Sequence, residues 1–303
     1  MDLIIHHGKC RDGWCAAYVA KKRYPEAKLL AVEYGLVPKQ LEELWADVVG
    51  KDVLMLDYSL TTRELNDGLS KIAKSFQIFD HHKTAQAVLE GAPYAIFDMY
   101  RSGAGLTWDI LFGNADCQSV LARPWYVDYV EDHDLWNHKL LDTLAINAYI
   151  ATLPFTVEAW DRLRFMKAME AADLGRGALA HVEHYVREIV KDAKTGLMAG
   201  CRIAILNAPY LNCSEVGHEL AKTHDFSITW YEPGNGQVKF SLRSVGDIDV
   251  SRVAKRNGGG GHKNAAGFEL PLREGRKLID QIHNRRGELE SSFADKREPG
   301  GCL

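Results

Sequence analysis

Histidine and aspartate side chains follow three short apolar runs near the start of the sequence. They are His7 after residues 3–5, Asp57 after residues 53–56, and Asp80, His81 and His82 after residues 75–79. Short runs of β-branched and aromatic residues are typical of buried parallel strands, and open α/β sheets place their sites at the carboxyl ends of such strands. We therefore expect three strand ends to converge on one metal centre.

Carboxylates and imidazoles in this combination are suited to divalent cations that act on phosphate esters. Two such ions about 3.5–4 Å apart can hold a hydroxide between them and stabilise the attacking and leaving oxygens of a phosphoryl displacement. An oxygen-rich shell with a few imidazoles favours Mn²⁺ or Mg²⁺ over a thiolate-rich zinc site. The candidate donors are His7, Asp12, Asp57, Asp80, His81 and one member of the segment 131–134. Any one of these residues, taken alone, is about as readily explained as an ordinary loop residue as it is as a metal ligand. That explanation does not account for the whole set at successive strand ends.

The elements that must position these side chains alternate between strands and amphipathic helices. Strands are predicted at residues 3–5, 28–32, 53–56, 76–79 and 95–97, and helices over residues 14–23, from 38 through 48, and from 61 towards 73. The last helix begins with a sequence that resembles a capping box, Thr61-Thr62-Arg63-Glu64. This order predicts an α/β fold with a doubly wound parallel sheet.

The rest of the chain has a different pattern. Residues 156–194 have helical spacing without strand runs, and strands at 201–206, 226–231, 237–242 and 265–270 then alternate with helices near 214–223 and 250–256. With 303 residues, the chain is long enough for two cores. We predict a metal-binding catalytic domain over 1–150, a helical connector over 151–198, a second, smaller α/β domain over 199–290, and a disordered tail over 291–303.

The composition excludes several classes of protein. The chain has 37 basic and 41 acidic residues, and its net charge of -4 argues against stable binding along duplex DNA. No run has the length of a signal-peptide core or a membrane span, so we expect a cytoplasmic protein without a membrane partner. The six cysteines contain no Cys-x-x-Cys pair, which favours reduced thiols over disulfides or a structural zinc site. The oligomeric state stays open.

Several motifs together resemble the DHH phosphoesterase superfamily and its associated DHHA1 domain. They are His7 with Asp12-Gly13, Asp57, Asp80-His81-His82, residues 102–108 and 129–136, Asn207 with residues 214–221, residues 241–244, and the Gly-Gly-Gly-Gly-His-Lys-Asn-Ala-Ala-Gly-Phe segment at 258–268. The resemblance covers nearly the whole chain. It implies a metal-dependent phosphodiesterase that hydrolyses short oligonucleotides or small nucleotides by a two-metal mechanism. The alternatives are a phosphatase or pyrophosphatase acting on a compact phosphate substrate and, from another class, a non-catalytic nucleotide-binding regulator.

The resemblance also implies a role for each residue of the centre. Asp57 would bridge two Mn²⁺ ions, or two Mg²⁺ or other divalent ions, with His7 on one ion and Asp12, His81 and Asp132 on the other. Asp80 would orient these ligands, and His82 would reach the scissile phosphate. The position of Asp132 in the family pattern favours it over Asp134, which is two residues further on.

One position departs from the family pattern. Many members begin with Asp-x-Asp-Gly, whereas this sequence has Cys10-Arg11-Asp12-Gly13. Either the first metal has a poorer shell of hard oxygens, or Cys10 is a bystander and water fills the gap. We favour the bystander, because a small cysteine beside a strand end usually serves packing.

Substrate-binding residues are expected at two further places. Ser102 is a typical residue for capping the start of a helix. The backbone amides of that first helical turn, together with Arg101, could also bind a substrate phosphate. The second place is the glycine run 258–261, for which a flexible linker is the alternative. We favour a substrate clamp formed by Gly260, Gly261 and His262 with Arg243. The sequence leaves open the exact substrate and the polarity of its degradation.

Overall fold

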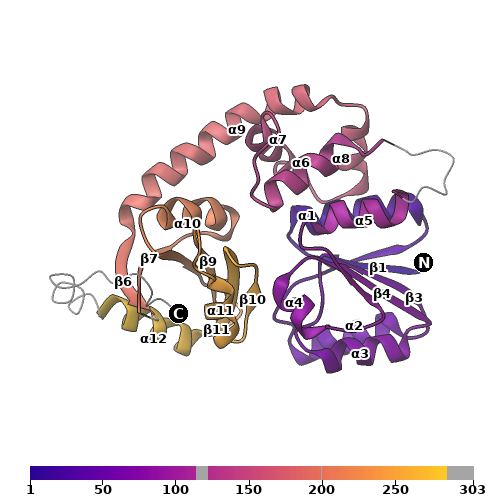
Figure 1. Cartoon of the computed structure of the whole chain (residues 1–303), viewed down its shortest axis with the longest axis horizontal. Helices are drawn as coiled ribbons and strands as arrows, with labels where there is room; N and C mark the ends of the chain where they lie inside the picture. The colour runs from indigo at the N-terminus through magenta and orange to yellow at the C-terminus, as the bar shows by residue number, and fades with distance from the viewer. Residues whose placement is uncertain (114–121, 199, 285–303) are drawn as a thin grey trace. The chain divides into compact units, whose positions relative to one another are not determined.

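The computed structural model describes residues 1–113, 122–198 and 200–284. The chain divides into two units, Met1–Ala180 and His181–Leu303, and each unit has its own β-sheet (Figure 1). The predicted domain bounds at 150, 198 and 290 stay predictions, and the predicted tail at 291–303 lies outside the described residues. Among the described helices, none is both long enough and apolar enough to cross a membrane.

The first unit begins with alternating strands and helices, and its described elements after β5 are helices. Its elements are β1 (Leu3–His7), α1 (Arg11–Arg23), β2 (Lys28–Val32), α2 (Pro38–Val48), β3 (Asp52–Leu56), α3 (Arg63–Ile72), β4 (Ser75–Asp80), α4 (Lys83–Val88), β5 (Ala95–Phe97), α5 (Gly103–Phe112), α6 (Trp125–Asp134), α7 (Thr143–Ile150), α8 (Val157–Asp161), the 3-10 helix η1 (Arg162–Arg164) and most of α9 (Ala168–Ile189).

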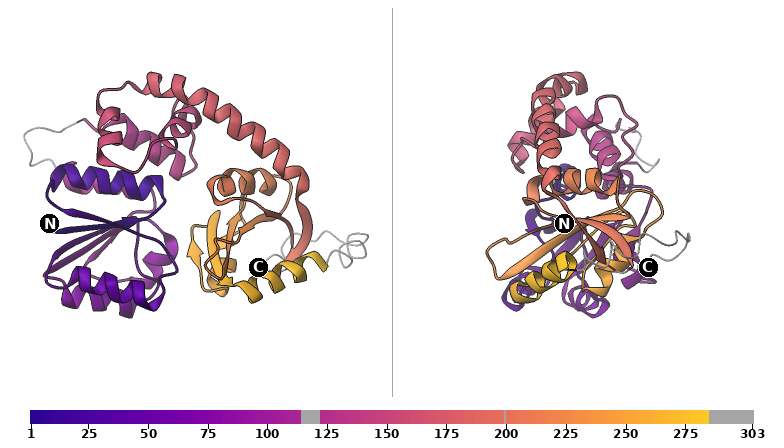
Figure 2. Two further views of the ribbon diagram at one scale, coloured as in Figure 1. Left: turned by 180° about the vertical axis from the view of Figure 1, so that it is seen from behind. Right: turned by 90° about the vertical axis from the view of Figure 1, so that its left-hand side faces the viewer.

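The first sheet has the strand order β2-β1-β3-β4-β5, and every pair is parallel. Helices α1 and α5 cover one face, and α2 and α3 cover the other (Figures 1 and 2). Alternate residues of β1 therefore enter two different cores: Ile4 packs with the α1 side, whereas Leu3 and Ile5 pack with α2 and α3. Burial on both faces explains why the strands are almost continuously apolar. The predicted doubly wound parallel sheet is confirmed.

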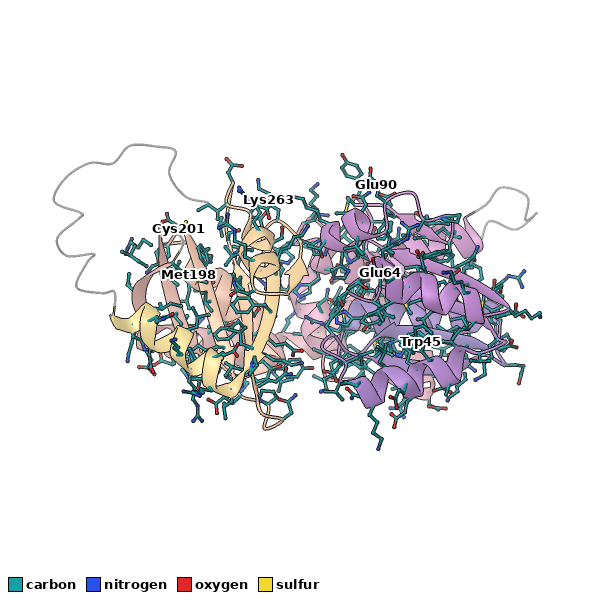
Figure 3. The ribbon with its side chains drawn as sticks, turned by 90° about the horizontal axis from the view of Figure 1, so that it is seen from below. Trp45, Glu64, Glu90, Met198, Cys201 and Lys263 are labelled. Carbon is teal, nitrogen blue, oxygen red and sulfur yellow. The ribbon has the colours of Figure 1, made fainter. Side chains whose placement is uncertain are left out.

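Local sequence signals set the helix positions in this unit. Thr62 caps α3 by accepting a hydrogen bond from the amide of Leu65, one residue later than the predicted box would place the cap. Helix α3 then packs closely against α2, whose Trp45 is seen in Figure 3. A Cβ atom at Gly68 would lie 2.4 Å from the Trp45 ring, so the glycine makes room for the indole.

The second unit has a mixed sheet with the order β10-β11-β9-β8-β7-β6, and among its described strands only the β7-β8 pair is parallel. Its elements after α9 are η2 (Val190–Asp192), β6 (Lys194–Met198), β7 (Cys201–Asn207), η3 (Tyr210–Asn212), α10 (Cys213–Ala221), β8 (Phe226–Tyr231), β9 (Gln237–Arg243), α11 (Val250–Arg256), β10 (Gly260–Gly261), β11 (Ala265–Pro271) and α12 (Leu272–Asn284).

Two cores lie on the two faces of this second sheet. Ile203 and Ile205 of β7 pack with α11 and α12, whereas Ala204 and Leu206 pack with α10 and the end of α9. Helix α10 and the pair α11–α12 accordingly lie on opposite sides of the sheet in Figure 1. A smaller α/β unit was predicted, and its helices at 213–221 and 250–256 agree with that prediction.

Candidate metal centre

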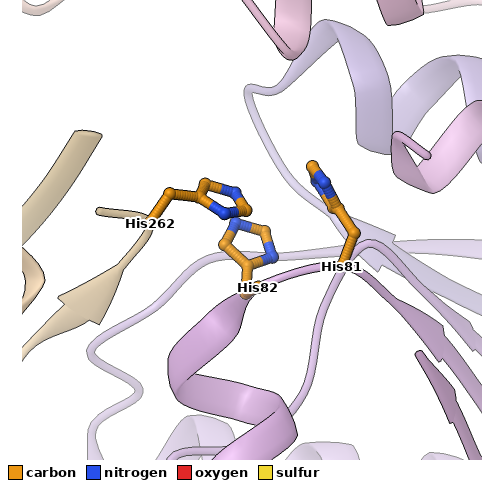
Figure 4. A group of neighbouring side chains, drawn as sticks. All are labelled: His81, His82 and His262. Carbon is orange, nitrogen blue, oxygen red and sulfur yellow. The ribbon is translucent and has the colours of Figure 1, made fainter. Parts of the chain in front are cut away.

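The three predicted strand ends come together at one edge of the first sheet. His7 ends β1, Asp57 follows β3, and Asp80 ends β4. Strand β3 pairs with both β1 and β4 in parallel, so their carboxyl ends are neighbours. His81 and His82 project from the short link between β4 and α4, as Figure 4 shows.

Asp57 lies at the middle of this edge and has an unusual backbone. Its φ is +52°, in the left-handed region that non-glycine residues rarely adopt, and its side chain is only 1% exposed. Oδ2 lies 3.4 Å from Nδ1 of His7, and Oδ1 lies 3.2 Å from Nε2 of His81. Neither oxygen has hydrogen-bonding geometry with a described residue. A buried carboxylate that directs one oxygen towards each of two imidazoles has the arrangement of a bridging metal ligand, and backbone strain of this kind is concentrated at functional sites.

Two further carboxylates surround the imidazole of His81. Nε2 of His81 lies 3.7 Å from Oδ2 of Asp12 and 3.5 Å from Oδ2 of Asp134. One ligand atom from each of Asp12, Asp57 and His81 lies within 4.8 Å of the other two. Asp12 and Asp134 lie in α1 and α6, whereas Asp57 and His81 directly follow β3 and β4. The fold therefore concentrates oxygen and nitrogen donors from four parts of the chain at one point.

The concentration of negative charge shifts the pKa values of these groups. Burial and the nearby carboxylates of Asp134 and Asp57 raise the pKa of Asp12 well above its usual range. Burial alone would raise the pKa of Asp57, but the imidazoles of His7 and His81 hold it well below that range. Burial alone would lower the pKa of His81, but Asp57 and Asp134 raise it to about 10. The cluster therefore requires positive charge, which protons or a divalent cation can supply.

Asp132, the predicted ligand from α6, has a different environment. Its carboxylate accepts hydrogen bonds from the amides of Lys139 and Leu140, at 3.0 and 3.1 Å, and from the hydroxyl of Thr143. It thus fixes the loop between α6 and α7. Residues two apart on a helix point in different directions, and it is Asp134 that reaches His81. The geometry does not match the predicted ligand role of Asp132, and it favours Asp134 instead.

Asp80 supports the two histidines that follow it. Its Oδ1 accepts hydrogen bonds from the amides of His81 and His82, at 2.7 and 3.1 Å, and lies 2.7 Å from Nδ1 of His82. The carboxylate opposes the effect of burial and raises the pKa of His82. This contact orients the His82 ring and places a proton on Nδ1, which is what an orienting role for Asp80 requires.

Glycines at two helix starts allow the backbone to approach Asp57. A Cβ atom at Gly13 would lie 2.6 Å from the carbonyl oxygen of His7, and one at Gly103 would lie 2.6 Å from Cβ of Asp57. Both distances are far shorter than real contacts. The first turns of α1 and α5 can therefore pack against the strand ends only because these positions lack side chains.

The start of α5 has a partner other than the expected substrate phosphate. Ser102 caps the helix as predicted, with its hydroxyl accepting from Gly105, but the amides of Gly103 and Ala104 donate to the two oxygens of Asp12 at 2.6 and 3.0 Å. These amides hold Asp12 in place and are not directed at a substrate.

Arg101 is held by acidic neighbours. Its guanidinium forms ion pairs with Asp109 at 2.6 Å and with Glu131 at 3.0 Å, and Glu131 also pairs with Arg123 at 2.9 Å. A substrate phosphate would have to displace a carboxylate to bind Arg101, so the predicted phosphate contact is not favoured here. The structural role of Glu131 was not predicted, although the motif at 129–136 contains it.

Two tyrosines beside His7 were also not predicted as part of this edge. The Tyr34 ring lies 5.0 Å from the His7 ring and 6.2 Å from the His82 ring, centroid to centroid, and 4.8 Å from the Tyr58 ring. Tyr34 follows β2 and Tyr58 follows Asp57, so both stand just after strand ends. That position is the signal that could have identified them.

Cys10 lies inside the donor cluster. Its Sγ, a ring nitrogen of His7 and a carboxylate oxygen of Asp57 all lie within 4.8 Å of one another. Burial and the carboxylates of Asp57, Asp134 and Asp12 raise the pKa of the thiol well above its usual range. Without a cation, this environment keeps the sulfur protonated.

The predicted substrate residues of the second unit occupy one end of its sheet. Arg243, at the end of β9, donates to the hydroxyls of Ser241 and Ser214 at 3.0 and 2.6 Å. The amide of His262 donates to the carbonyl of Ala265 at 2.8 Å and closes the hairpin between β10 and β11. The substrate contacts themselves stay predictions.

Backbone conformation and close packing constrain the glycine run 258–261, which leads into this hairpin and includes β10. Gly258 and Gly261 have φ values of +80° and +134°, while a Cβ atom at Gly259 would lie 2.0 Å from the carbonyl oxygen of Gly267. Gly260 pairs with Gly267 in the ladder. The run is therefore a constrained turn and edge strand, which disfavours the flexible-linker alternative.

Comparison with known proteins gives a family match in the second unit and similar proteins over most of the chain. The model of the DHHA1 domain matches residues 212–285. An uncharacterized protein of Acanthamoeba polyphaga mimivirus is 28% identical over 292 residues, which cover 88% of this chain and 67% of that protein. Oligoribonuclease NrnB of Bacillus subtilis is 24% identical over 257 residues, which cover 73% of this chain and 63% of the enzyme.

A solved structure extends this similarity to the fold. RecJ from Thermus thermophilus, solved in complex with Mn²⁺, matches with a TM-score of 0.56 and 16% identity, over 100% of this chain and 53% of RecJ. At this identity the match supports the fold alone. The chain thus corresponds to about two thirds of each curated relative and about half of RecJ.

Proposed function

Because the chain belongs to the DHH/DHHA1 family of phosphoesterases, we propose that it is a divalent-metal-dependent phosphodiesterase that cleaves short oligonucleotides or small nucleotides. The observation that carries the proposal is the position of Asp57 between His7 and His81. The similarity to an oligoribonuclease supports the choice of substrate class.

The donor residues fit a pair of divalent cations. Asp57 is buried with both oxygens outside hydrogen-bonding geometry, and such a charged group is costly unless a cation or proton compensates it. We propose that Asp57 bridges two ions, with His7 on one side and with Asp12, His81 and Asp134 on the other. When bound, the ions would activate water and neutralise charge on the phosphate, and their preference for oxygen and imidazole ligands favours Mn²⁺ or Mg²⁺.

The remaining residues of the first unit would prepare the centre for substrate. Asp80 orients His82, whose ring carries a proton on Nδ1 and can present Nε2 to the scissile phosphate or its leaving oxygen. The first amides of α5 hold Asp12 so that its carboxylate keeps one orientation. Preorganised charge of this kind lowers the barrier because no reorganisation is needed during the reaction.

Residues of the second unit would bind the rest of the substrate. Arg243 carries a planar guanidinium, and the glycines of the constrained turn leave the backbone beside His262 without Cβ atoms, so a substrate can approach it closely. We propose that these groups bind phosphate or ribose of a nucleotide.

A substrate panel tests the proposed activity. Purified protein with Mn²⁺ is offered labelled dinucleotides, longer oligomers, cyclic dinucleotides, 3'-phosphoadenosine phosphate, pyrophosphate and bis-p-nitrophenyl phosphate, with Asp57→Asn as the inactive control. We expect turnover of dinucleotides or short oligomers to exceed that of the other substrates. Preferred hydrolysis of pyrophosphate or of a phosphomonoester would instead support the phosphatase alternative. Nucleotide binding without hydrolysis of any substrate would support the regulator.

A further inference from the structure

The thiol of Cys10 lies in a donor group with His7 and Asp57, and it is the one member of the group without a role in the proposed function. Cys10 immediately precedes α1, with extended backbone angles of φ −116° and ψ 131°. Its Sγ, a ring nitrogen of His7 and a carboxylate oxygen of Asp57 lie within 4.8 Å of one another. Three different ligand types, sulfur, nitrogen and oxygen, therefore face the same small volume.

A second observation distinguishes this group from a cysteine that merely packs. Asp57 is 1% exposed, is held in a strained backbone conformation, and has neither oxygen in hydrogen-bonding geometry with a described residue. A buried anion directed into the group requires a cationic partner. Cys15 provides the contrast, because it is fully buried in the apolar core with Ala16 and Val19, as expected for a packing cysteine.

We propose that Cys10 is a thiolate ligand of one metal position and that, with His7 and Asp57, it makes this position selective for a borderline-soft cation such as Zn²⁺ or Co²⁺. The oxygen-rich position near Asp12 and Asp134 keeps its preference for Mn²⁺ or Mg²⁺, so the centre holds two different metals. This inference rests on the proposed metal-dependent function and replaces the bystander interpretation of Cys10.

The chemistry of the three donors supports a softer metal. Zn²⁺ binds Cys sulfur, His nitrogen and carboxylate oxygen, and a site with three protein ligands keeps a fourth position for water or substrate. Mn²⁺ and Mg²⁺ prefer oxygen, so a thiolate lowers their relative affinity at this position. As the sulfur binds the cation, its proton leaves to solvent, and metal binding at this position therefore releases one proton.

Cobalt spectroscopy tests the ligand directly. The full-length protein is stripped of metal with a chelator and titrated with Co²⁺, and the near-ultraviolet absorption is recorded. We expect the wild type to show a thiolate-to-cobalt charge-transfer band, and Cys10→Ser to lose it while still binding Co²⁺ at the other position. Cys213→Ser is the matched control, because Cys213 is also partly exposed but belongs to α10, and it should keep the band.

Metal competition tests the selectivity. Each protein is dialysed against mixtures of Zn²⁺ and Mn²⁺, and the bound metals are measured by elemental analysis. Since loss of a residue that only orients a ligand lowers metal affinity about 10–100-fold, loss of the ligand itself should lower the Zn²⁺-over-Mn²⁺ preference by roughly a hundredfold. Cys10→Asp retains a ligand and should shift the preference towards Mn²⁺, so it serves as the informative variant if Cys10→Ser folds poorly.

The outcomes separate this inference from the proposed function. Wild-type protein that binds Co²⁺ without the charge-transfer band, or a Cys10→Asp variant with unchanged preference, overturns ligation by Cys10 but leaves the metal-dependent phosphodiesterase standing. Wild-type protein that binds no divalent cation and hydrolyses no phosphodiester overturns both.

Discussion

The carboxylate of Asp134 lies 3.5 Å from Nε2 of His81, and this contact joins the end of α6 to the link after β4. Asp132, on the same helix, instead accepts hydrogen bonds from the loop that follows. The two aspartates therefore belong to different parts of the structure, one to the donor cluster and one to the α6–α7 connection.

Exchanging each aspartate for asparagine should separate these roles. We expect Asp134→Asn to weaken Mn²⁺ binding by about tenfold or more, because a metal ligand is lost. The free energy of unfolding should change little. Asp132→Asn should instead lower the free energy of unfolding by about 1–3 kcal/mol, because buried hydrogen bonds to the loop are lost, and should bind Mn²⁺ nearly normally. Calorimetric titration with Mn²⁺ and chemical denaturation measure the two effects. The reverse result would restore Asp132 as the ligand.

The convergence of His7, Asp57 and Asp80 was predictable, because buried parallel strands have almost continuous apolar runs and their carboxyl ends share one edge. The choice between Asp132 and Asp134 was not. It depends on the rotation of α6 about its axis, which is set by packing in the folded chain. Likewise, the amides at the start of α5 were recognisable as anion-binding groups, but the sequence could not indicate that Asp12 is their partner.

Two elements of the second unit were not predicted, because their local sequences lack the usual signals of a strand or of a helix boundary. Strand β6 (Lys194–Met198) is an edge strand with mostly partly buried or exposed residues, so it lacks a clear apolar run. Helix α12 (Leu272–Asn284) begins directly after β11, which ends at Pro271, and no turn signal separates them. Patterns of hydrophobicity detect buried elements with clear boundaries better than elements of these two kinds.

Asp57→Asn tests the bridging carboxylate. An amide offers a single neutral acceptor oxygen in place of two charged ones, so we expect hydrolysis to be abolished while the fold is retained. Saturating Mn²⁺ should raise the melting temperature of the wild type, because a ligand that binds only the native state stabilises it, and it should leave the variant unchanged. Hydrolysis assays and thermal denaturation with and without Mn²⁺ measure this. Near wild-type turnover in the variant would contradict the dimetal assignment.

Gly103→Ala tests the close approach of α5 to the centre. The new Cβ atom would lie 2.6 Å from Cβ of Asp57, so either the helix or the aspartate must move. We expect a stability loss of about 1–3 kcal/mol, as for overpacked cores, together with weaker metal binding. Gly177→Ala is the matched control, since Gly177 also lies in a helix but its added Cβ would meet no atom within 4 Å beyond the adjoining backbone of that helix. That change should be neutral or stabilising by up to about 1 kcal/mol.

Arg243→Ala and His262→Ala test whether the second unit binds substrate. If these residues contact the nucleotide away from the reacting phosphate, loss of a charge-assisted contact costs about 2–3 kcal/mol, or tens to a hundredfold in KM. A fall in kcat as well would indicate that this binding energy also positions the scissile phosphate. Bis-p-nitrophenyl phosphate, which lacks the nucleotide groups, should be hydrolysed almost normally by both variants.

Two controls make this comparison decisive. Arg276→Ala removes an arginine from the same unit whose guanidinium pairs with Glu232 at 2.7 Å on the surface, and it should leave KM unchanged. Bound Mn²⁺, measured by elemental analysis, should be the same in all three variants and the wild type. Equal loss of activity towards nucleotide and aryl substrates, or loss of metal from Arg243→Ala or His262→Ala, would mean that these residues serve the metal centre itself and do not bind the distal part of the substrate.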